Sequence, residues 1–408
     1  MAAALLVLAC MALLGYKIVI PRLAERHYQR GLELYAQGER QQAVLELTKS
    51  IDLVGSRPEA YHQRGLMLAE AGELQKAIDD YGQALRLDPD NPQLLLHRAI
   101  ALRLSGQTET ALADLDASLA LNDTCAQAFY QRGLVQAAMG RFAEAIADYD
   151  RSIALDASNA ETFSRRGEVL ASINDFKGAI ADYDRLFAAG EATPERYRQR
   201  GWFKLKIKDY PGAVADLEMA RPSFPHDDEL MLMLGSAYVN TQQPQKALAI
   251  FDEALAANPS LAAAHSERGG ALLQLGRFPE AKAAFGRAIE LDPTAAKAYM
   301  GRGISRALAN DHQGAIDDFS RALSLDASLV QVRFNRGVAY AALEDYPRAI
   351  ADYNAVLQGN PRNAEALYAR GVAHINLRSM DEGCADLRRS LELGYKPAAQ
   401  MIAIYCGG

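Results

Sequence analysis

The chain of 408 residues is 50% hydrophobic and 23% charged, and it carries a formal net charge of -7. This composition supplies ample apolar surface for a folded protein. The acidic balance argues against a nucleic-acid partner, because phosphate binding needs a surface rich in Lys and Arg.

The first element in the chain is an apolar segment. Residues 2–20 are apolar except for Lys17. A helix of about 19 residues spans roughly 28 Å, which is close to the thickness of the hydrocarbon core of a bilayer. We therefore expect residues 1–23 to form an N-terminal membrane anchor, a hydrophobic helix that crosses the membrane once through residues 2–20.

Two other interpretations of this segment stay open. A cleaved signal peptide usually has a basic start and a small-residue cleavage site, and neither is evident here. A lipid-modified Cys10 is disfavoured by the apolar residues that follow it. Basic residues follow the segment and none precedes it, which would keep the repeats of an anchored protein in the cytoplasm. Cleavage would instead give a secreted or periplasmic protein.

An Arg-Gly pair then recurs every 34 residues. Ten of the eleven positions in this register are glycine, and the exception is Ala99. The position twelve residues after the glycine, or after Ala99, is alanine in every repeat from Ala43 to Ala349. The position four residues after that is an aromatic residue or leucine. Within each period, helical apolar spacing is interrupted once, for example at Gly140, so each period is predicted to form two helices.

A charged pair accompanies the glycine column. Arginine precedes this column in ten of eleven repeats, nine times before glycine and once before Ala99. An acid follows sixteen residues after most of these arginines, as in Arg166 and Asp182. The repeat that lacks the arginine, at Leu234, also lacks the acid. We therefore expect the pairs to form within a repeat and Arg268, which faces Ala284, to be the exception, although pairing to the following repeat stays open.

The C-terminal end carries two cysteines that could meet. Cys384 and Cys406 lie equally far from a probable turn at residues 394–396. If residues 398–408 form a capping helix and tail, the sulfurs could approach within bonding distance. A disulfide would indicate an oxidising compartment, and two buried thiols are the alternative.

The 34-residue period with its glycine, Ala-x-x-x-aromatic and proline columns resembles the tetratricopeptide repeat family, from Ala24 to Pro397 in eleven tandem repeats. The resemblance implies an all-α fold, a right-handed superhelical solenoid of antiparallel helix pairs over residues 24–397. One departure is the arginine before the glycine, where the family pattern has leucine.

The resemblance also implies a binding surface. In this family the concave face is lined by the first helix of each repeat, at its second, fifth, ninth, twelfth and thirteenth positions. Aromatic and arginine side chains tend to anchor interfaces. Carried onto this chain, these positions predict a partner-binding groove that includes Tyr28, Tyr35, Tyr130, Arg198, Trp202, Phe334 and Tyr368. Packing against adjacent repeats is the alternative role for each of them.

No motif for chemistry stands out. The sequence has no phosphate-binding Gly-x-x-x-x-Gly-Lys-Ser/Thr run, no His-Glu-x-x-His and no paired Cys-x-x-Cys spacing. We therefore expect no cofactor, no metal and no small-molecule substrate, and an enzyme is a remote alternative. The sequence predicts a non-enzymatic, membrane-tethered scaffold that binds protein or peptide partners, with a secreted or periplasmic binding module as the second interpretation.

Overall fold

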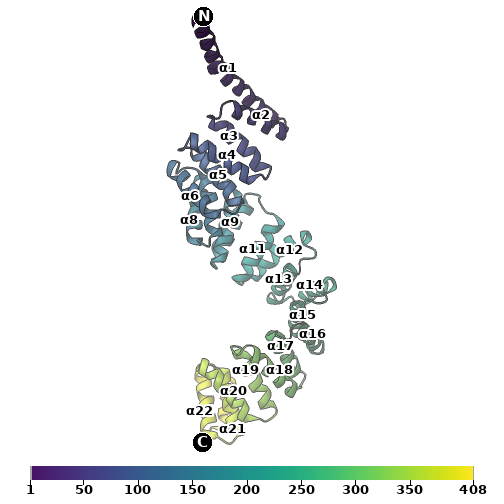
Figure 1. The fold of residues 1–408 in the computed structure, drawn as a ribbon. Coiled ribbons are helices and arrows are strands. Elements are labelled where there is room, and N and C mark those ends of the chain that lie inside the picture. The colour runs from purple at the N-terminus through teal and green to yellow at the C-terminus, as the bar shows by residue number, and fades with distance from the viewer. Residues whose placement is uncertain (1, 408) are drawn as a thin grey trace. The chain divides into compact units, whose positions relative to one another are not determined.

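The computed structural model describes residues 2–407, with side chains from Tyr16 onward. These residues form 23 α-helices and one short 3-10 helix, and the described part of the chain contains no β-strand. Successive helices pack in pairs (Figure 1). The prediction of an all-α array of paired helices is confirmed.

Each repeat consists of a first and a second helix. The first helices are α1 (Ala2–Ala36), α3 (Pro58–Glu70), α5 (Pro92–Leu104), α7 (Ala126–Ala138), α9 (Ala160–Ser172), α11 (Pro194–Lys206), α13 (Asp228–Asn240), α15 (Ala262–Gln274), α17 (Ala296–Leu308), α19 (Val330–Ala342) and α21 (Ala364–Asn376). The second helices are α2 (Arg40–Leu53), α4 (Leu74–Leu87), α6 (Thr108–Leu121), α8 (Phe142–Leu155), α10 (Phe176–Ala188), α12 (Tyr210–Ala220), α14 (Pro244–Ala257), α16 (Phe278–Leu291), α18 (His312–Leu325), α20 (Tyr346–Gly359) and α22 (Met380–Glu392). A closing helix, α23 (Pro397–Tyr405), follows.

The chain divides into two compact units, residues 1–192 and 193–408. The first unit holds α1 to α10 and the second holds α11 to α23. Helix α1 runs without interruption from Ala2 to Ala36, so the proposed boundary at residue 23 falls inside one helix. The sequence limits of 1–23, 24–397 and 398–408 stay predictions.

Local sequence sets the helix ends. The Asn91 side chain accepts hydrogen bonds from the backbone N–H groups of Gln93 and Leu94, and Pro92 occupies the first helical position, where its missing N–H costs nothing. Between the two helices of a repeat the backbone turns through a positive φ, which glycine adopts in several repeats, for example at Gly140. Short turns therefore hold the helices of a repeat together.

The packing of each first helix places it on one face of the array. Within a compact unit, a first helix contacts the second helix of its own repeat and that of the preceding one, and it also contacts the next first helix, as α13 does with α15. Because neighbouring first helices touch, they line a shared face in each unit. The predicted binding positions lie on these helices.

The glycine column permits the close contact of the two helices. A Cβ added at Gly65 would lie 2.7 Å from a ring carbon of Tyr81, and one added at Gly269 would lie 2.8 Å from the Phe285 ring. The aromatic or leucine side chain sixteen residues later therefore packs directly on the glycine. The alanines of the facing column, such as Ala145, are fully buried beside this contact.

The Arg-acid column forms clamps within repeats. Arg166 donates from Nη2 to Asp182 Oδ1 at 2.5 Å and from Nε to Oδ2 at 2.9 Å. The side chains of Asp182 and Arg166 are 4% and 16% exposed. Equivalent two-bond pairs join Arg64–Asp80, Arg98–Asp114, Arg132–Asp148, Arg200–Asp216, Arg302–Asp318, Arg336–Asp352 and Arg370–Asp386. We call each of these eight pairs a guanidinium clamp.

The third guanidinium nitrogen extends several clamps to the preceding repeat. Arg132 Nη1 donates to Asp116 at 2.7 Å, and Arg370 Nη1 donates to Asn354 at 2.6 Å. Both partners lie on the second helix of the preceding repeat, sixteen residues before the arginine. One arginine therefore holds three helices together.

Two repeats depart from the predicted pairing. Arg30 does not bind Glu46, which instead contacts His27 and Lys49, while Arg30 bonds Glu33 on its own helix. The predicted pair of the first repeat is therefore wrong.

Arg268 has Ala284 in place of an acid at the clamp position, but the prediction that it is left without a partner is wrong. Its Nε donates to Asp252 of the preceding repeat at 2.6 Å. The guanidinium therefore turns away from its own repeat, where no acid is present.

The prediction of a single-pass membrane protein is contradicted. In the part of the chain that the structure describes, no helix is both long and apolar enough to span a bilayer. The described part of α1 carries the charged residues Lys17, Arg22 and Glu25 and continues through Pro21 into the first repeat. Residues 1–15 of the predicted anchor lie outside the described side chains.

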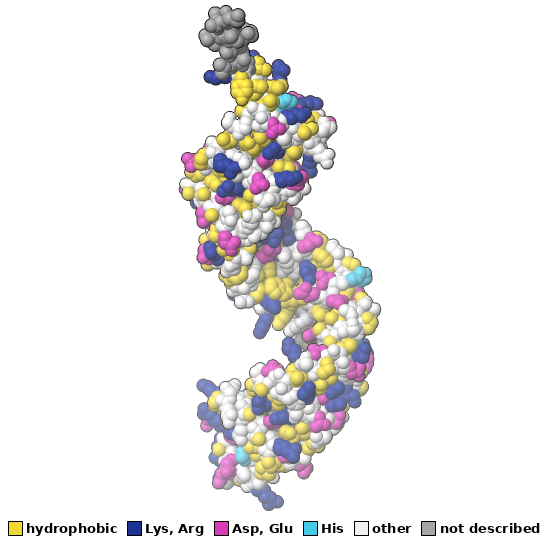
Figure 2. Space-filling model, in the orientation of Figure 1, with side chains coloured by type: hydrophobic (Ala, Val, Ile, Leu, Met, Phe, Trp, Pro, Cys, Tyr) yellow, Lys and Arg dark blue, Asp and Glu magenta, His cyan; other side chains and the backbone are white. Residues whose placement is uncertain are grey.

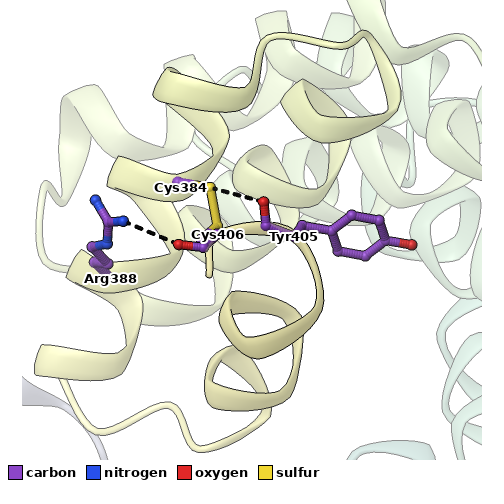
Figure 3. The surroundings of a disulfide bond; sticks show 4 residues. All are labelled: Cys384, Arg388, Tyr405 and Cys406. Carbon is purple, nitrogen blue, oxygen red and sulfur yellow. Dashed lines mark hydrogen bonds between the residues drawn. A yellow bond between two sulfur atoms is a disulfide. The ribbon is translucent and has the colours of Figure 1, made fainter. Parts of the chain in front are cut away.

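The closing helix α23 packs on α22 and α21, where the first helix of a further repeat would lie. A disulfide joins Cys384 of α22 to Cys406 at the end of α23, and the two Cα atoms are 5.7 Å apart (Figure 3). Arg388 Nη2 also donates to the Cys406 carbonyl oxygen at 3.5 Å. The disulfide fastens both ends of the last helical hairpin.

Two adjacent glycines give a matched test of the helix contact. Gly269 faces Phe285, whereas no atom lies within 4 Å of a Cβ placed at Gly270. We expect Gly269→Ala to lower the free energy of unfolding by about 1–3 kcal/mol through overpacking. Gly270→Ala should raise it by about 0.5–1 kcal/mol, because alanine favours a helix interior. Chemical denaturation followed by circular dichroism measures both, and equal effects would contradict the packing role of Gly269.

The clamps predict a non-additive cost of mutation. Asp182→Ala removes the buried carboxylate from the Arg166 guanidinium and leaves it only the exposed Asp150 of the preceding repeat. We therefore expect a loss of about 3 kcal/mol in the free energy of unfolding. The double variant Asp182→Ala with Arg166→Leu should lose less, because no uncompensated charge stays buried. Asp252→Ala is the control: its side chain is 51% exposed, and we expect a loss of about 0.2–1 kcal/mol. Additive losses in the double variant would refute the clamp.

Candidate partner-binding surface

The structure places all seven predicted groove residues on first helices. Each side chain is half-buried. They belong to five helices: Tyr28 and Tyr35 to α1, Tyr130 to α7, Arg198 and Trp202 to α11, Phe334 to α19 and Tyr368 to α21.

In the first compact unit, each predicted tyrosine contacts another side chain of the protein. The Arg57 guanidinium lies 5.1 Å from the centre of the Tyr28 ring, and burial raises the pKa of the Tyr28 hydroxyl. Tyr35 donates a hydrogen bond to Glu70 Oε1 at 2.5 Å, which links α1 to α3. The Tyr130 ring centre lies 6.2 Å from that of Tyr149. Each tyrosine therefore has a partner within the protein, while part of its side chain faces solvent.

In the second compact unit, the predicted residues lie at two places. Phe334 packs on Tyr353 with ring centres 5.7 Å apart, and Tyr368 packs on Tyr395 at 5.1 Å. Their helices α19 and α21 contact each other. At the start of the unit, Arg198 Nη2 binds Glu229 Oε2 on α13 at 2.6 Å.

Trp202 lines a depression between first helices. The depression has a volume of about 340 Å³ and is lined by residues of α11, α13 and α15. Its walls are largely apolar and include Trp202, Leu205, Leu232 and Met233. The Lys206 ammonium lies 5.1 Å from the Trp202 ring centre, at the edge of the depression. We call this hollow the Trp202 depression.

One carboxylate faces this apolar hollow. Glu267 of α15 lines the Trp202 depression and is half-buried. Burial raises the pKa of its carboxyl, although Lys297 opposes this electrostatically. Among the described residues, no donor or cation lies within hydrogen-bonding or ion-pairing distance of Glu267. The sequence prediction missed it, because it is the sixth residue of its helix and not at one of the five family positions.

A histidine pair forms a second polar feature, in the first compact unit. His62 Nε2 of α3 lies 2.7 Å from His97 Nδ1 of α5, and the Tyr81 ring packs beside both. Burial, together with the neighbouring His97, lowers the pKa of His62 to about 4. Burial also lowers the pKa of His97. At neutral pH one uncharged imidazole can donate to the other, which joins two first helices.

Charged side chains of both signs are scattered over the visible face of the molecule. Figure 2 shows Lys and Arg interspersed with Asp and Glu along the helices. Many of these residues form pairs at helical spacing, such as Arg165 with Glu161 and Glu168. Such a mixed surface fits protein partners better than the phosphate backbone of a nucleic acid.

Family comparisons match most of the repeat region. Three models of the tetratricopeptide repeat match residues 232–281, 267–329 and 334–394, residues 58–91 and 126–159, and residues 81–113. The comparison with curated proteins finds no match to this sequence.

The comparison with solved structures finds other repeat proteins. A tetratricopeptide repeat protein from Parabacteroides merdae is 14% identical with a TM-score of 0.50, over 61% of this chain and 98% of that one. Yeast Tom70 is 15% identical with a TM-score of 0.44, over 94% of each chain. PilF of Pseudomonas aeruginosa is 19% identical with a TM-score of 0.43, over 53% of this chain and 93% of that one.

The matched family models cover more than half of the sequence, and the described helices form the pairs that these models represent. The chain therefore belongs to the tetratricopeptide repeat family.

Proposed function

We propose that this protein is a non-enzymatic scaffold that binds protein or peptide partners on the face lined by its first helices. The observation that carries the proposal is the position of the seven aromatic and arginine residues. They lie on the first helices, and each keeps part of its side chain exposed. Large side chains that are held in place by packing, yet still reach solvent, are well suited to anchor a partner.

The internal contacts of these residues support a preformed surface. Tyr35 is held by Glu70, Arg198 by Glu229, and the Tyr130 ring by Tyr149. Because the side chains are already ordered, a partner loses less conformational entropy when it binds them. Their rigidity favours binding and does not by itself select one partner.

The proposal predicts that binding depends on the first helices in each compact unit. Peptides can be selected from a random phage-displayed library against the full chain, and their dissociation constants measured by calorimetry. We expect Tyr130→Ala or Phe334→Ala to weaken binding of a selected peptide by at least about tenfold, as for an interface anchor.

Exposed apolar residues on second helices provide matched controls. Leu87 of α4 and Leu121 of α6 are 41% and 46% exposed. Leu87→Ala and Leu121→Ala should leave the dissociation constants unchanged. Selected peptides that bind every first-helix variant as well as the original chain, but bind the second-helix variants poorly, would refute the proposed surface.

A further inference from the structure

The Trp202 depression combines an apolar hollow with a single unpaired carboxylate. Trp202 and Leu205 come from α11, Leu232 and Met233 from α13, and Glu267 from α15. All three helices belong to the second compact unit. The hollow therefore has a polar group at a defined place on its wall.

The lysines near Glu267 do not neutralise it directly. Lys206 also lines the depression, and its ammonium lies over the Trp202 ring, with no ion pair to Glu267 among the described residues. Lys297 of α17 attracts the Glu267 carboxylate electrostatically but forms no ion pair with it among the described residues. Glu267 is thus a half-buried acid whose charge has lost part of its hydration without gaining a bonded partner.

A partially desolvated carboxylate is stabilised most by a cation that forms hydrogen bonds with it. The apolar wall beside Glu267 favours a hydrocarbon side chain, and Met233 can adapt its shape to several such groups. A partner that supplies both features would satisfy the whole depression.

We propose that the Trp202 depression binds a peptide segment in which an apolar side chain lies next to a lysine or arginine. The apolar side chain packs against Trp202 and Met233, and the basic group pairs with Glu267. The inference rests on the proposed function and assigns the chemical class of the partner at this one place. An acidic segment is disfavoured, because it would bring a second carboxylate to Glu267.

Trp202 is the only tryptophan of the chain, so its fluorescence reports directly on this depression. The probes are peptides selected from the phage library together with two substituted forms of each. In one form the basic residue beside the apolar residue is replaced by glutamine, and in the other by glutamate. Titration of the full chain with each peptide gives a dissociation constant from the fluorescence change.

For peptides that change the Trp202 signal, we expect the basic form to bind at least about tenfold more tightly than the glutamine form, and the glutamate form to bind most weakly. Glu267→Gln should abolish the difference between the basic and glutamine forms, and Glu267→Lys should favour the glutamate form. Affinity for the basic form should fall as the pH is lowered toward the pKa of Glu267, because protonation removes the charge. Glu267→Gln should remove this pH dependence.

Glu290→Gln is the matched control, because Glu290 is an exposed second-helix glutamate, with 67% of its side chain accessible. This substitution should leave the dissociation constant of every peptide unchanged. Circular dichroism and the thermal midpoint check that the Glu267 variants fold.

The results separate the inference from the proposed function. Peptides that bind, lose affinity with Tyr130→Ala or Phe334→Ala and leave Trp202 fluorescence unchanged would overturn the inference and support the scaffold function. Equal affinity of the basic and glutamine forms, or an unchanged preference in Glu267→Gln, would also overturn the inference. Failure of the library to yield any binding peptide would contradict both.

Discussion

The guanidinium clamp is the interaction on which the geometry of most repeats depends. Apolar contacts between two helices are non-directional and tolerate small rotations. A planar guanidinium that gives two parallel hydrogen bonds to one carboxylate accepts only a narrow range of orientations. Because the aspartates lie at the helix interface and are almost completely buried, rotation of one helix against the other would leave a buried charge without its partner.

The clamp and the glycine contact lie side by side in the repeats that have both. Arg64 and Gly65 are adjacent on α3, and their partners Asp80 and Tyr81 are adjacent on α4. The polar pair fixes orientation, and the close approach at the glycine allows the aromatic ring to fill the space between the helices. Stability therefore comes from the interior side of each first helix. The outward side of each first helix takes no part in these two contacts, and the proposed binding residues lie there.

The repeat period made most of the fold predictable. Regular columns revealed the helix pairs, the glycine contact and the within-repeat arginine pairs, because each column repeats one physical environment. The first repeat could not be predicted in this way, since His27 and Lys49 compete for Glu46 through contacts of that repeat alone. The partner of Arg268 was missed because the predicted pairs join an arginine to the acid sixteen residues after it. Asp252 lies sixteen residues before Arg268.

The candidate surface was less predictable than the fold. The five groove positions of the family correctly predicted that Trp202 and Phe334 lie on first helices. They do not predict which neighbouring side chains contact each ring. Glu267 lay outside those positions, and only the packing of three helices shows that it faces a hollow. The prediction of a membrane span was wrong, because the described part of α1 carries Lys17, Arg22 and Glu25 and continues into the first repeat, and no described helix is long and apolar enough to span a bilayer.

The absence of clamps in two successive repeats has a mechanical consequence. The seventh repeat has Leu234 and Ile250 in place of the charged pair, and in the eighth Arg268 turns away from Ala284. Apart from the hydrogen bond from Asn258 to Asp228 at the end of the first of them, the hairpins α13–α14 and α15–α16 are therefore held mainly by apolar contacts. Such contacts permit small sliding movements at little energetic cost. These hairpins also form two sides of the Trp202 depression. Elastic deformation of the second compact unit should concentrate there, so the hollow can widen or narrow to fit its occupant while the clamped repeats keep their shape.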